Sequence, residues 1–116
     1  MGREYDVEQV RAAAEAVLSG AADRDTTGLA VRGTLALLSA KAPGRNVEVR
    51  VPPYGAVQCV PGPRHTRGTP PAVVETDATT WVELAVGRLS WAQAVEKRRI
   101  TASGERADLD HHLPLL

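Results

Sequence analysis

Phenylalanine is absent from this chain of 116 residues, and aromatic residues make up only 3% of it. The interior must therefore be built from Val, Leu and Ala, with two Trp and two Tyr. Small aliphatic side chains can pack to full density, but they can also line a cavity with a smooth hydrocarbon wall. The composition is thus compatible with an ordinary Ala-rich core and with a ligand cavity.

Three further features that the sequence lacks exclude several classes of protein. Cysteine occurs once, at Cys59, which excludes an intrachain disulfide and is typical of a reducing compartment. The formal net charge is +0, whereas nucleic-acid-binding domains usually carry a basic excess. No apolar run reaches the length of a membrane span, and MGREYDVEQV lacks the apolar segment of a signal peptide. We therefore expect a cytoplasmic protein that binds no nucleic acid and does not span a membrane.

The length predicts one domain, residues 1–116, which can bury roughly two-thirds of the surface of the unfolded chain. Its first helix is predicted from about residue 6 to 19. Asp6 and Gln9 have the spacing of a capping pair, apolar residues then recur at helical spacing, and Gly20 is a typical stop.

A second helix is predicted to follow, capped by Thr26 or Thr27 and ending near Pro43. Because it is apolar nearly all round, we expect it to be the most buried helix. Arg32 is a lone charge in this apolar run, and we interpret it as an arginine whose stem packs while its head reaches solvent.

Alternating apolar and polar residues then indicate strands. The short connection through Pro52-Pro53 requires the first two strands to pair antiparallel, because only antiparallel neighbours can be joined by a short turn. The expected strands cover residues 46–51, 54–60, 72–75 and 99–103.

Clear helix boundaries mark the segment from Thr76 to Leu109. Asp77 is a typical N-cap, Trp81 and Leu84 belong to one apolar stripe, and Gly87 is a typical stop. Beyond it, Ser90 and Gln93 have the spacing of a capping box that opens a short helix. A last short helix is predicted to carry Leu109 and Leu113 and to end before Pro114.

Polar residues that could bind an anion are concentrated in one loop, GPRHTRGTPP. Arg64, His65 and Arg67 lie there between glycines and prolines, and arginine forks suit a carboxylate or phosphate. A solvated, proline-stiffened loop is the alternative interpretation. The loop lacks the GxxxxGK[ST] pattern of a phosphate-binding loop.

The sequence predicts no catalytic residues, metal site or cofactor. GxSxG is absent, and no carboxylate pair is indicated. Cys59 lies in a predicted strand with no base nearby in sequence, as a buried structural cysteine would. The adjacent His111 and His112 would point about 100° apart on a helix, which does not suit a shared metal ion.

Taken in order, these elements resemble the sterol carrier protein type 2 superfamily, and most closely its bacterial, actinobacterial branch. The resemblance covers nearly the whole chain. It is carried by VEVRVPPYGAVQC, by GPRHTRGTPPAVVETD, by the W-x-x-L-A-x-G of residues 81–87, and by the run from Trp91 to Leu109 with its A-S-G-x-R-A-D-L.

The resemblance implies an α+β fold in which helices cover a mostly antiparallel, five-stranded sheet, although only four strands are evident in the sequence. It also implies an apolar cavity for fatty acids, acyl-CoA or sterols. Lipid binding and transport without catalysis is therefore the leading hypothesis.

In this hypothesis the ligand, a lipid or other hydrophobic small molecule, lies between the sheet and the helices, and Arg64, His65 and Arg67 contact its polar head. An accessory protein that keeps the fold and binds a protein partner instead is a second hypothesis, and an enzyme that uses the Arg64–His65–Arg67 loop is a third. The sequence does not indicate the oligomeric state. The residues expected to line the cavity are Leu35, Leu38, Trp81, Leu84 and Leu89.

Overall fold

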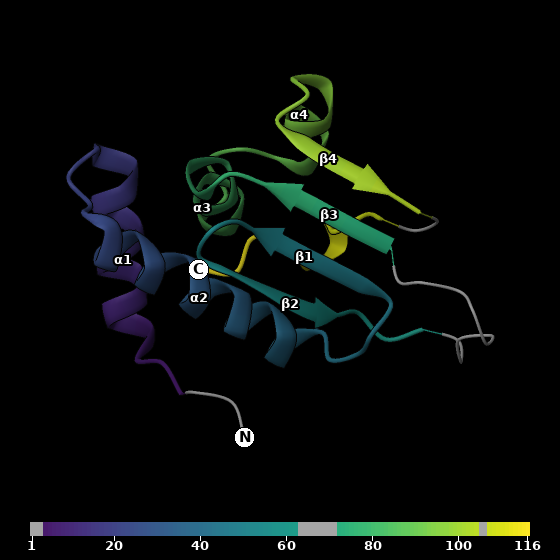
Figure 1. The fold of residues 1–116 in the computed structure, drawn as a ribbon, viewed down its shortest axis with the longest axis horizontal. Coiled ribbons are helices and arrows are strands. Elements are labelled where there is room, and N and C mark those ends of the chain that lie inside the picture. Colours follow the sequence, from purple (N-terminus) through teal and green to yellow (C-terminus); the bar gives the residue numbers. More distant parts are fainter. Residues whose placement is uncertain (1–3, 63–71, 105–106) are drawn as a thin grey trace.

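A computed structural model describes residues 4–62, 72–104 and 107–116. Two helices come first, three strands follow, and two further helices precede the last strand (Figure 1). The elements are α1 (Val7–Ser19), α2 (Arg24–Lys41), β1 (Val47–Val51), β2 (Gly55–Cys59), β3 (Ala72–Thr76), α3 (Ala78–Val86), α4 (Trp91–Glu96), β4 (Ile100–Ser103) and the 3-10 turn η1 (Asp110–His112). The α+β class is confirmed. None of the helices in the described residues is long and apolar enough to cross a membrane.

Side-chain caps open the helices largely as predicted. The carboxylate of Asp6 accepts from the backbone of Glu8 at 2.9 Å, and that of Asp77 accepts from the backbone of Thr80 at 2.8 Å. The reciprocal capping box of Ser90 and Gln93 is also present. These bonds satisfy amides that have no partner within the helix.

The predicted start of α2 was wrong. Asp23, rather than Thr26 or Thr27, is its N-cap and accepts from the backbone of Thr26 at 2.8 Å. Thr27 lies inside the helix, where its hydroxyl donates to the carbonyl of Asp23. An aspartate three residues upstream therefore provides the cap and lengthens α2 by almost one turn.

The sheet departs from the expected five-stranded, mostly antiparallel arrangement. It has four strands in the described residues, in the order β2-β1-β3-β4. β1 pairs antiparallel with β2 as predicted, but it pairs parallel with β3, with Val47 opposite Ala72 and Val49 opposite Val74. β3 lies on the other side of β1 from β2 and runs in the same direction as β1. The sheet is therefore mixed.

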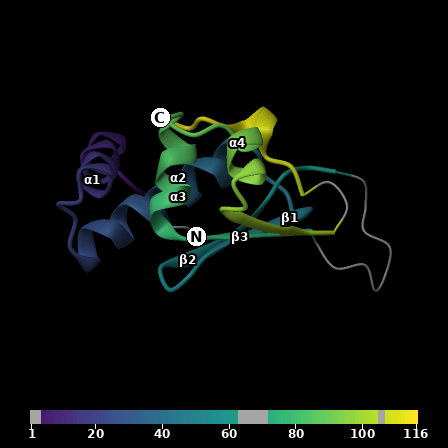
Figure 2. The same cartoon turned by 90° about the horizontal axis from the view of Figure 1, so that it is seen from above.

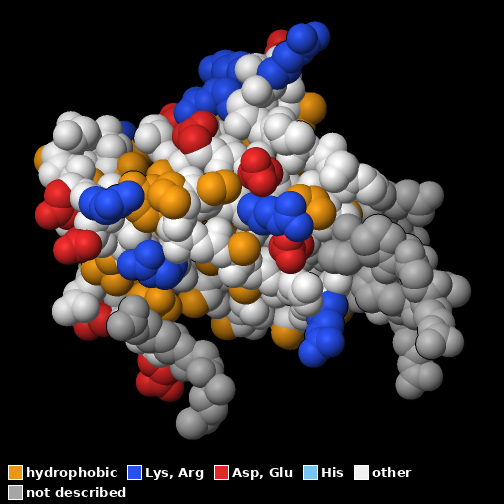
Figure 3. Space-filling model, viewed as in Figure 1, with side chains coloured by type: hydrophobic (Ala, Val, Ile, Leu, Met, Phe, Trp, Pro, Cys, Tyr) orange, Lys and Arg blue, Asp and Glu red, His pale blue; other side chains and the backbone are white. Residues whose placement is uncertain are grey.

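Helices α2, α3 and α4 lie on one face of this sheet, and α1 packs beyond α2 and α3 at one end (Figures 1 and 2). The strands alternate accordingly, with Val47, Val49 and Val51 buried towards the helices and Arg50 exposed. On the opposite face, acidic and basic side chains lie among hydrophobic ones (Figure 3). Arg50 there forms an ion pair with Glu48. One face of the sheet thus supplies the core.

The main hydrophobic core lies between the sheet and the helices, and Trp81 is its largest fully buried side chain. The indole Nε1 of Trp81 donates to Thr34 Oγ1 at 2.8 Å, and this hydroxyl also bonds to the carbonyl of Ala30 at 2.6 Å. Every buried side-chain nitrogen or oxygen atom in the described residues has a hydrogen-bond partner. The bond therefore joins α3 to α2 without leaving a polar group unpaired.

The last predicted helix is only the three-residue turn η1. Leu109 is fully buried as a core residue, but Leu113 is extended, with φ −111° and ψ 149°. Pro114 disfavours helical geometry at the residue before it. The chain then runs against α3, where the amides of Leu115 and Leu116 both donate to the carbonyl of Ala85.

Helices α1 and α2 touch through small residues. A Cβ atom added to Gly33 would lie 2.4 Å from Val10 Cγ2, so the absence of a side chain at Gly33 lets the helices approach. Ala13, Ala14 and Ala30 continue this contact as a second, smaller buried cluster. Close packing of α1 on α2 therefore depends on Gly33.

We expect Gly33→Ala to lower the free energy of unfolding by about 1–3 kcal/mol, because the added methyl overpacks the contact with fully buried Val10. Urea denaturation followed by circular dichroism measures this. Gly28→Ala is the matched control in the same helix, because its Cβ would meet only the terminal atoms of the flexible Arg32 side chain. That variant should be as stable as the parent or more stable by up to about 1 kcal/mol. Equal stability of Gly33→Ala and the parent would contradict the prediction.

Candidate ligand-binding site

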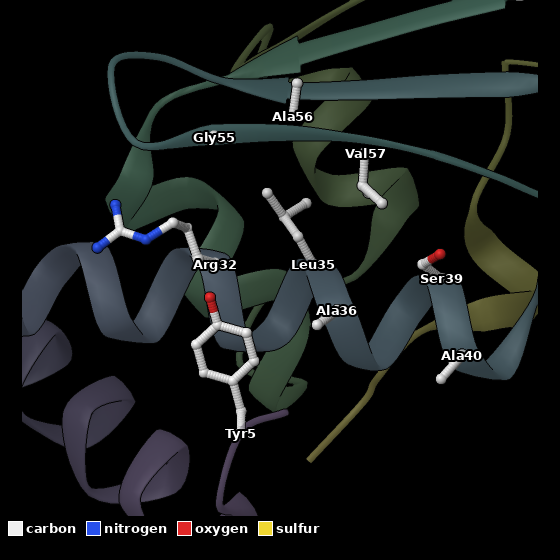
Figure 4. A pocket seen from close by; sticks show the side chains of 9 residues that line it. All are labelled: Tyr5, Arg32, Leu35, Ala36, Ser39, Ala40, Gly55, Ala56 and Val57. Atoms are coloured by element: carbon white, nitrogen blue, oxygen red, sulfur yellow. The ribbon is translucent and has the colours of Figure 1, made fainter. Parts of the chain in front are cut away.

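A pocket of about 490 Å³ lies between α2 and the edge strand β2. Helix α2 provides one wall, β2 provides the opposite wall, and the segment before α1 reaches the pocket with one side chain (Figure 4). A volume of several hundred cubic ångströms is typical of pockets for small molecules. The lining residues are Tyr5, Arg32, Leu35, Ala36, Ser39, Ala40, Gly55, Ala56 and Val57.

Small residues at a helical repeat create this space. Arg32, Ala36 and Ala40 recur every four residues and so follow one another along the same face of α2. The two alanines fill little of the volume in front of them. On the opposite wall Gly55 has no side chain, and Val57 points towards α2 (Figure 4). The walls of the pocket therefore carry mostly small side chains, and these are mainly aliphatic.

Polar groups mark one end of the pocket. The guanidinium of Arg32 donates from Nη1 to the backbone carbonyl of Tyr54 at 3.2 Å. Arg32 is exposed, in agreement with the prediction that its head reaches solvent. Tyr5 extends towards α2 beside Arg32 at this end, whereas Ser39 places a second hydroxyl farther along α2 (Figure 4). The chemistry is that of an apolar space with one cationic end.

The five residues predicted to line a cavity all lie in the main core cluster. Leu35, Leu38, Trp81, Leu84 and Leu89 are at most 4% exposed, so they pack against one another and against the sheet. Leu35 is the member of this set that also lines the pocket. The core and the pocket therefore meet at Leu35.

Sequence reasoning did not identify the other pocket residues. The alanines and Gly55 carry no chemical signal, and Tyr5 lies far from them in sequence. The i, i+4, i+8 repeat of Arg32, Ala36 and Ala40 was the available signal, because it places a cation at the end of a small-residue stripe. The predicted polar loop of Arg64, His65 and Arg67 lies outside the described residues.

Cys59, His111 and His112 are not among the residues that line the pocket. Cys59 is fully buried at the end of β2, and burial raises the pKa of its thiol to about 11. His111 and His112 lie in η1. Among residues 4–62, 72–104 and 107–116, no three His, Cys, Asp or Glu side chains come together as a metal site would require.

Fold and pocket together define a small α+β domain whose mixed sheet is covered by helices on one face and whose edge strand borders an apolar pocket. The family model described as bacterial SCP ortholog matches residues 23–115. The chain therefore belongs to the bacterial sterol carrier protein (SCP) family, which confirms the resemblance noted in its sequence. Comparison with curated proteins gave no match.

We expect Cys59 to resist alkylation in the folded protein. At pH 8 a thiol with a pKa of about 11 is thiolate in roughly one molecule in a thousand, against about a quarter for an exposed cysteine. Modification by iodoacetamide should thus be at least about a hundredfold slower in buffer than in urea. In the folded protein the rate should keep rising between pH 9 and 11, whereas in urea it should level off near pH 9. Similar rates in the two conditions would refute a buried thiol.

Proposed function

We propose that this protein binds a hydrophobic small molecule, such as a lipid, and does not transform it. The observation that carries the proposal is the pocket of about 490 Å³ between α2 and β2, whose walls are mainly aliphatic. Membership of the bacterial SCP family supports the same class of ligand. Fold alone does not define an activity, and the pocket itself is therefore the stronger support.

The physics of such a pocket favours broad selectivity. Burial of each methylene contributes roughly 0.8 kcal/mol whatever molecule it belongs to. Fatty acids, acyl-CoA and sterol-like molecules all offer this apolar surface. Ala40 lies eight residues after Arg32 on α2, so the stripe between them is about 12 Å long at the helical rise. Chains of roughly this length should gain the most from the pocket.

A longer ligand would extend the site into the core, and this is the role we propose for the predicted cavity residues. Leu35 lines the pocket and belongs to the same core cluster as Leu38 and Trp81. Rotation of the Leu35 side chain would let an acyl chain contact them and, farther on, Leu84 and Leu89. A head-group role for Arg64, His65 and Arg67 stays a prediction, as does a cytoplasmic location.

An accessory protein without a ligand is the second candidate function. The observation that favours it is the tight packing of the predicted cavity residues, of which Leu38 and Trp81 are 0% exposed. Purification from the native host separates the two candidates. Lipid released by organic extraction supports the carrier, whereas a stable protein partner without lipid supports the accessory role.

We expect the affinity for neutral 1-alkanols to rise about fourfold with each added methylene until the chain exceeds roughly 12 Å. Ala36→Phe should weaken binding at least about tenfold, because the ring fills the pocket. Ala12→Phe is the matched control, because Ala12 is exposed on α1 and does not line the pocket. Isothermal titration calorimetry measures both variants. Equal binding by Ala36→Phe and the parent would place the ligand elsewhere.

The fluorescence of Trp81 reports whether long ligands reach the core. In a Trp91→Phe background Trp81 is the single tryptophan of the chain, and it is fully buried. Ligands longer than the pocket should shift its emission, whereas short ones should leave it unchanged. No change with a chain of about eighteen carbons that binds by calorimetry would restrict the site to the pocket between α2 and β2.

A further inference from the structure

Arg32 carries a charge that no acidic side chain neutralises in the described part of the chain. The ion pairs there join Arg11 to Glu8, Arg50 to Glu48, Arg88 to Glu15 and Arg99 to Glu83. The one hydrogen-bond partner of Arg32 in these residues is the carbonyl of Tyr54, which accepts from Nη1 at 3.2 Å. A guanidinium has five N–H donors, so most of them remain available at the pocket.

Two glycines make room for the Arg32 side chain. A Cβ atom on Gly28, one turn earlier in α2, would lie 2.6 Å from Nη2 and 2.9 Å from Nη1 of Arg32. A Cβ atom on Gly55, across the pocket in β2, would lie 3.3 Å from Cγ of Arg32 and 3.6 Å from Cδ1 of Leu35. The side chain therefore extends from α2 towards β2 (Figure 4). Its head donates to the carbonyl of Tyr54.

Arg32 lies at the end of the apolar wall, where it can contact the terminal group of a bound chain. Arg32 occupies one end of the α2 stripe, and Ala36 and Ala40 continue it for about 12 Å. A molecule with an aliphatic chain along the stripe would present its terminal group to the guanidinium. A neutral terminal group would gain little there, whereas an oxyanion would form charge-assisted hydrogen bonds with the planar fork.

We infer that Arg32 makes the pocket selective for amphiphiles with an anionic head, a carboxylate or a phosphate ester, over neutral molecules with the same chain. This inference rests on the proposed function, because it presupposes that the aliphatic part occupies the pocket. Arg32 is a specificity-determining residue in this scheme and is separate from the loop of Arg64, His65 and Arg67.

The test compares three ligands with chains of about ten carbons: decanoate, decyl phosphate and 1-decanol. Calorimetry at low salt should show the anions binding about fivefold more tightly than the alcohol, as expected for an ion pair at an exposed site. Arg32→Gln should abolish this preference, so that the three ligands bind with similar affinity. Arg24→Gln removes an exposed charge from the first turn of the same helix and should behave like the parent.

Gly28→Ala tests the position of the charge rather than its presence. The added methyl lies where the guanidinium now lies, so Arg32 must move although the net charge is unchanged. The variant should lose most of the anion preference while its thermal unfolding temperature stays the same or rises. Arg32→Lys should keep a reduced preference, because it retains the charge and loses the fork. For the parent, the preference should shrink as salt is raised from 50 to 500 mM.

The outcomes distinguish a failure of the inference about Arg32 from a failure of the proposed function. Equal affinity of the parent for all three ligands, or an anion preference that survives Arg32→Gln, overturns the inference and leaves the proposed function intact. Failure of 1-decanol and both anions to bind overturns the proposed function itself. Tighter binding of decyl phosphate than decanoate assigns a phosphorylated head, and the reverse assigns a carboxylate. Circular dichroism of each variant checks that it is folded.

Discussion

The rest of the structure depends on the rotation of α2 about its own axis, and the hydrogen bond from Trp81 Nε1 to Thr34 Oγ1 joins α2 to α3 at that rotation. With Thr34 turned towards α3, Leu35 and Leu38 face the core and Gly33 faces α1. The stripe from Arg32 to Ala40 then faces the edge strand β2. Successive residues differ by about 100° around the helix, so a change of register by one residue would misplace all of these faces together.

The scarcity of aromatic residues was compatible with a cavity inside the core, but the open space lies elsewhere. The core is filled, because two tryptophans and many valines and leucines pack between the sheet and the helices. Open space occurs instead where α2 meets β2, since Ala36, Ala40 and Gly55 are too small to close the gap. In this protein small side chains at a boundary between elements, rather than missing rings in the interior, produce the pocket.

Local signals in the sequence predicted local structure well. Asp6, Asp77 and the Ser90–Gln93 box marked real helix starts because capping involves residues only two or three positions apart. The parallel β1–β3 pair could not be predicted this way, because the order of strands depends on contacts between distant segments. The pocket could not be predicted for the same reason, because Tyr5, α2 and β2 are far apart in the sequence. Leu35 was identified because it belongs to both the core and the pocket.

Tyr5 stands apart from the other lining residues in its origin. The match to the bacterial SCP family begins at residue 23, so α2 and β2 belong to the shared domain, whereas Tyr5 precedes it. One lining side chain of the pocket thus comes from a part of the chain that the family model does not cover. A substitution at Tyr5 would therefore alter the lining of the pocket without touching the sheet or the main core cluster. The space between α2 and β2 can thus change in shape while the packed core stays the same.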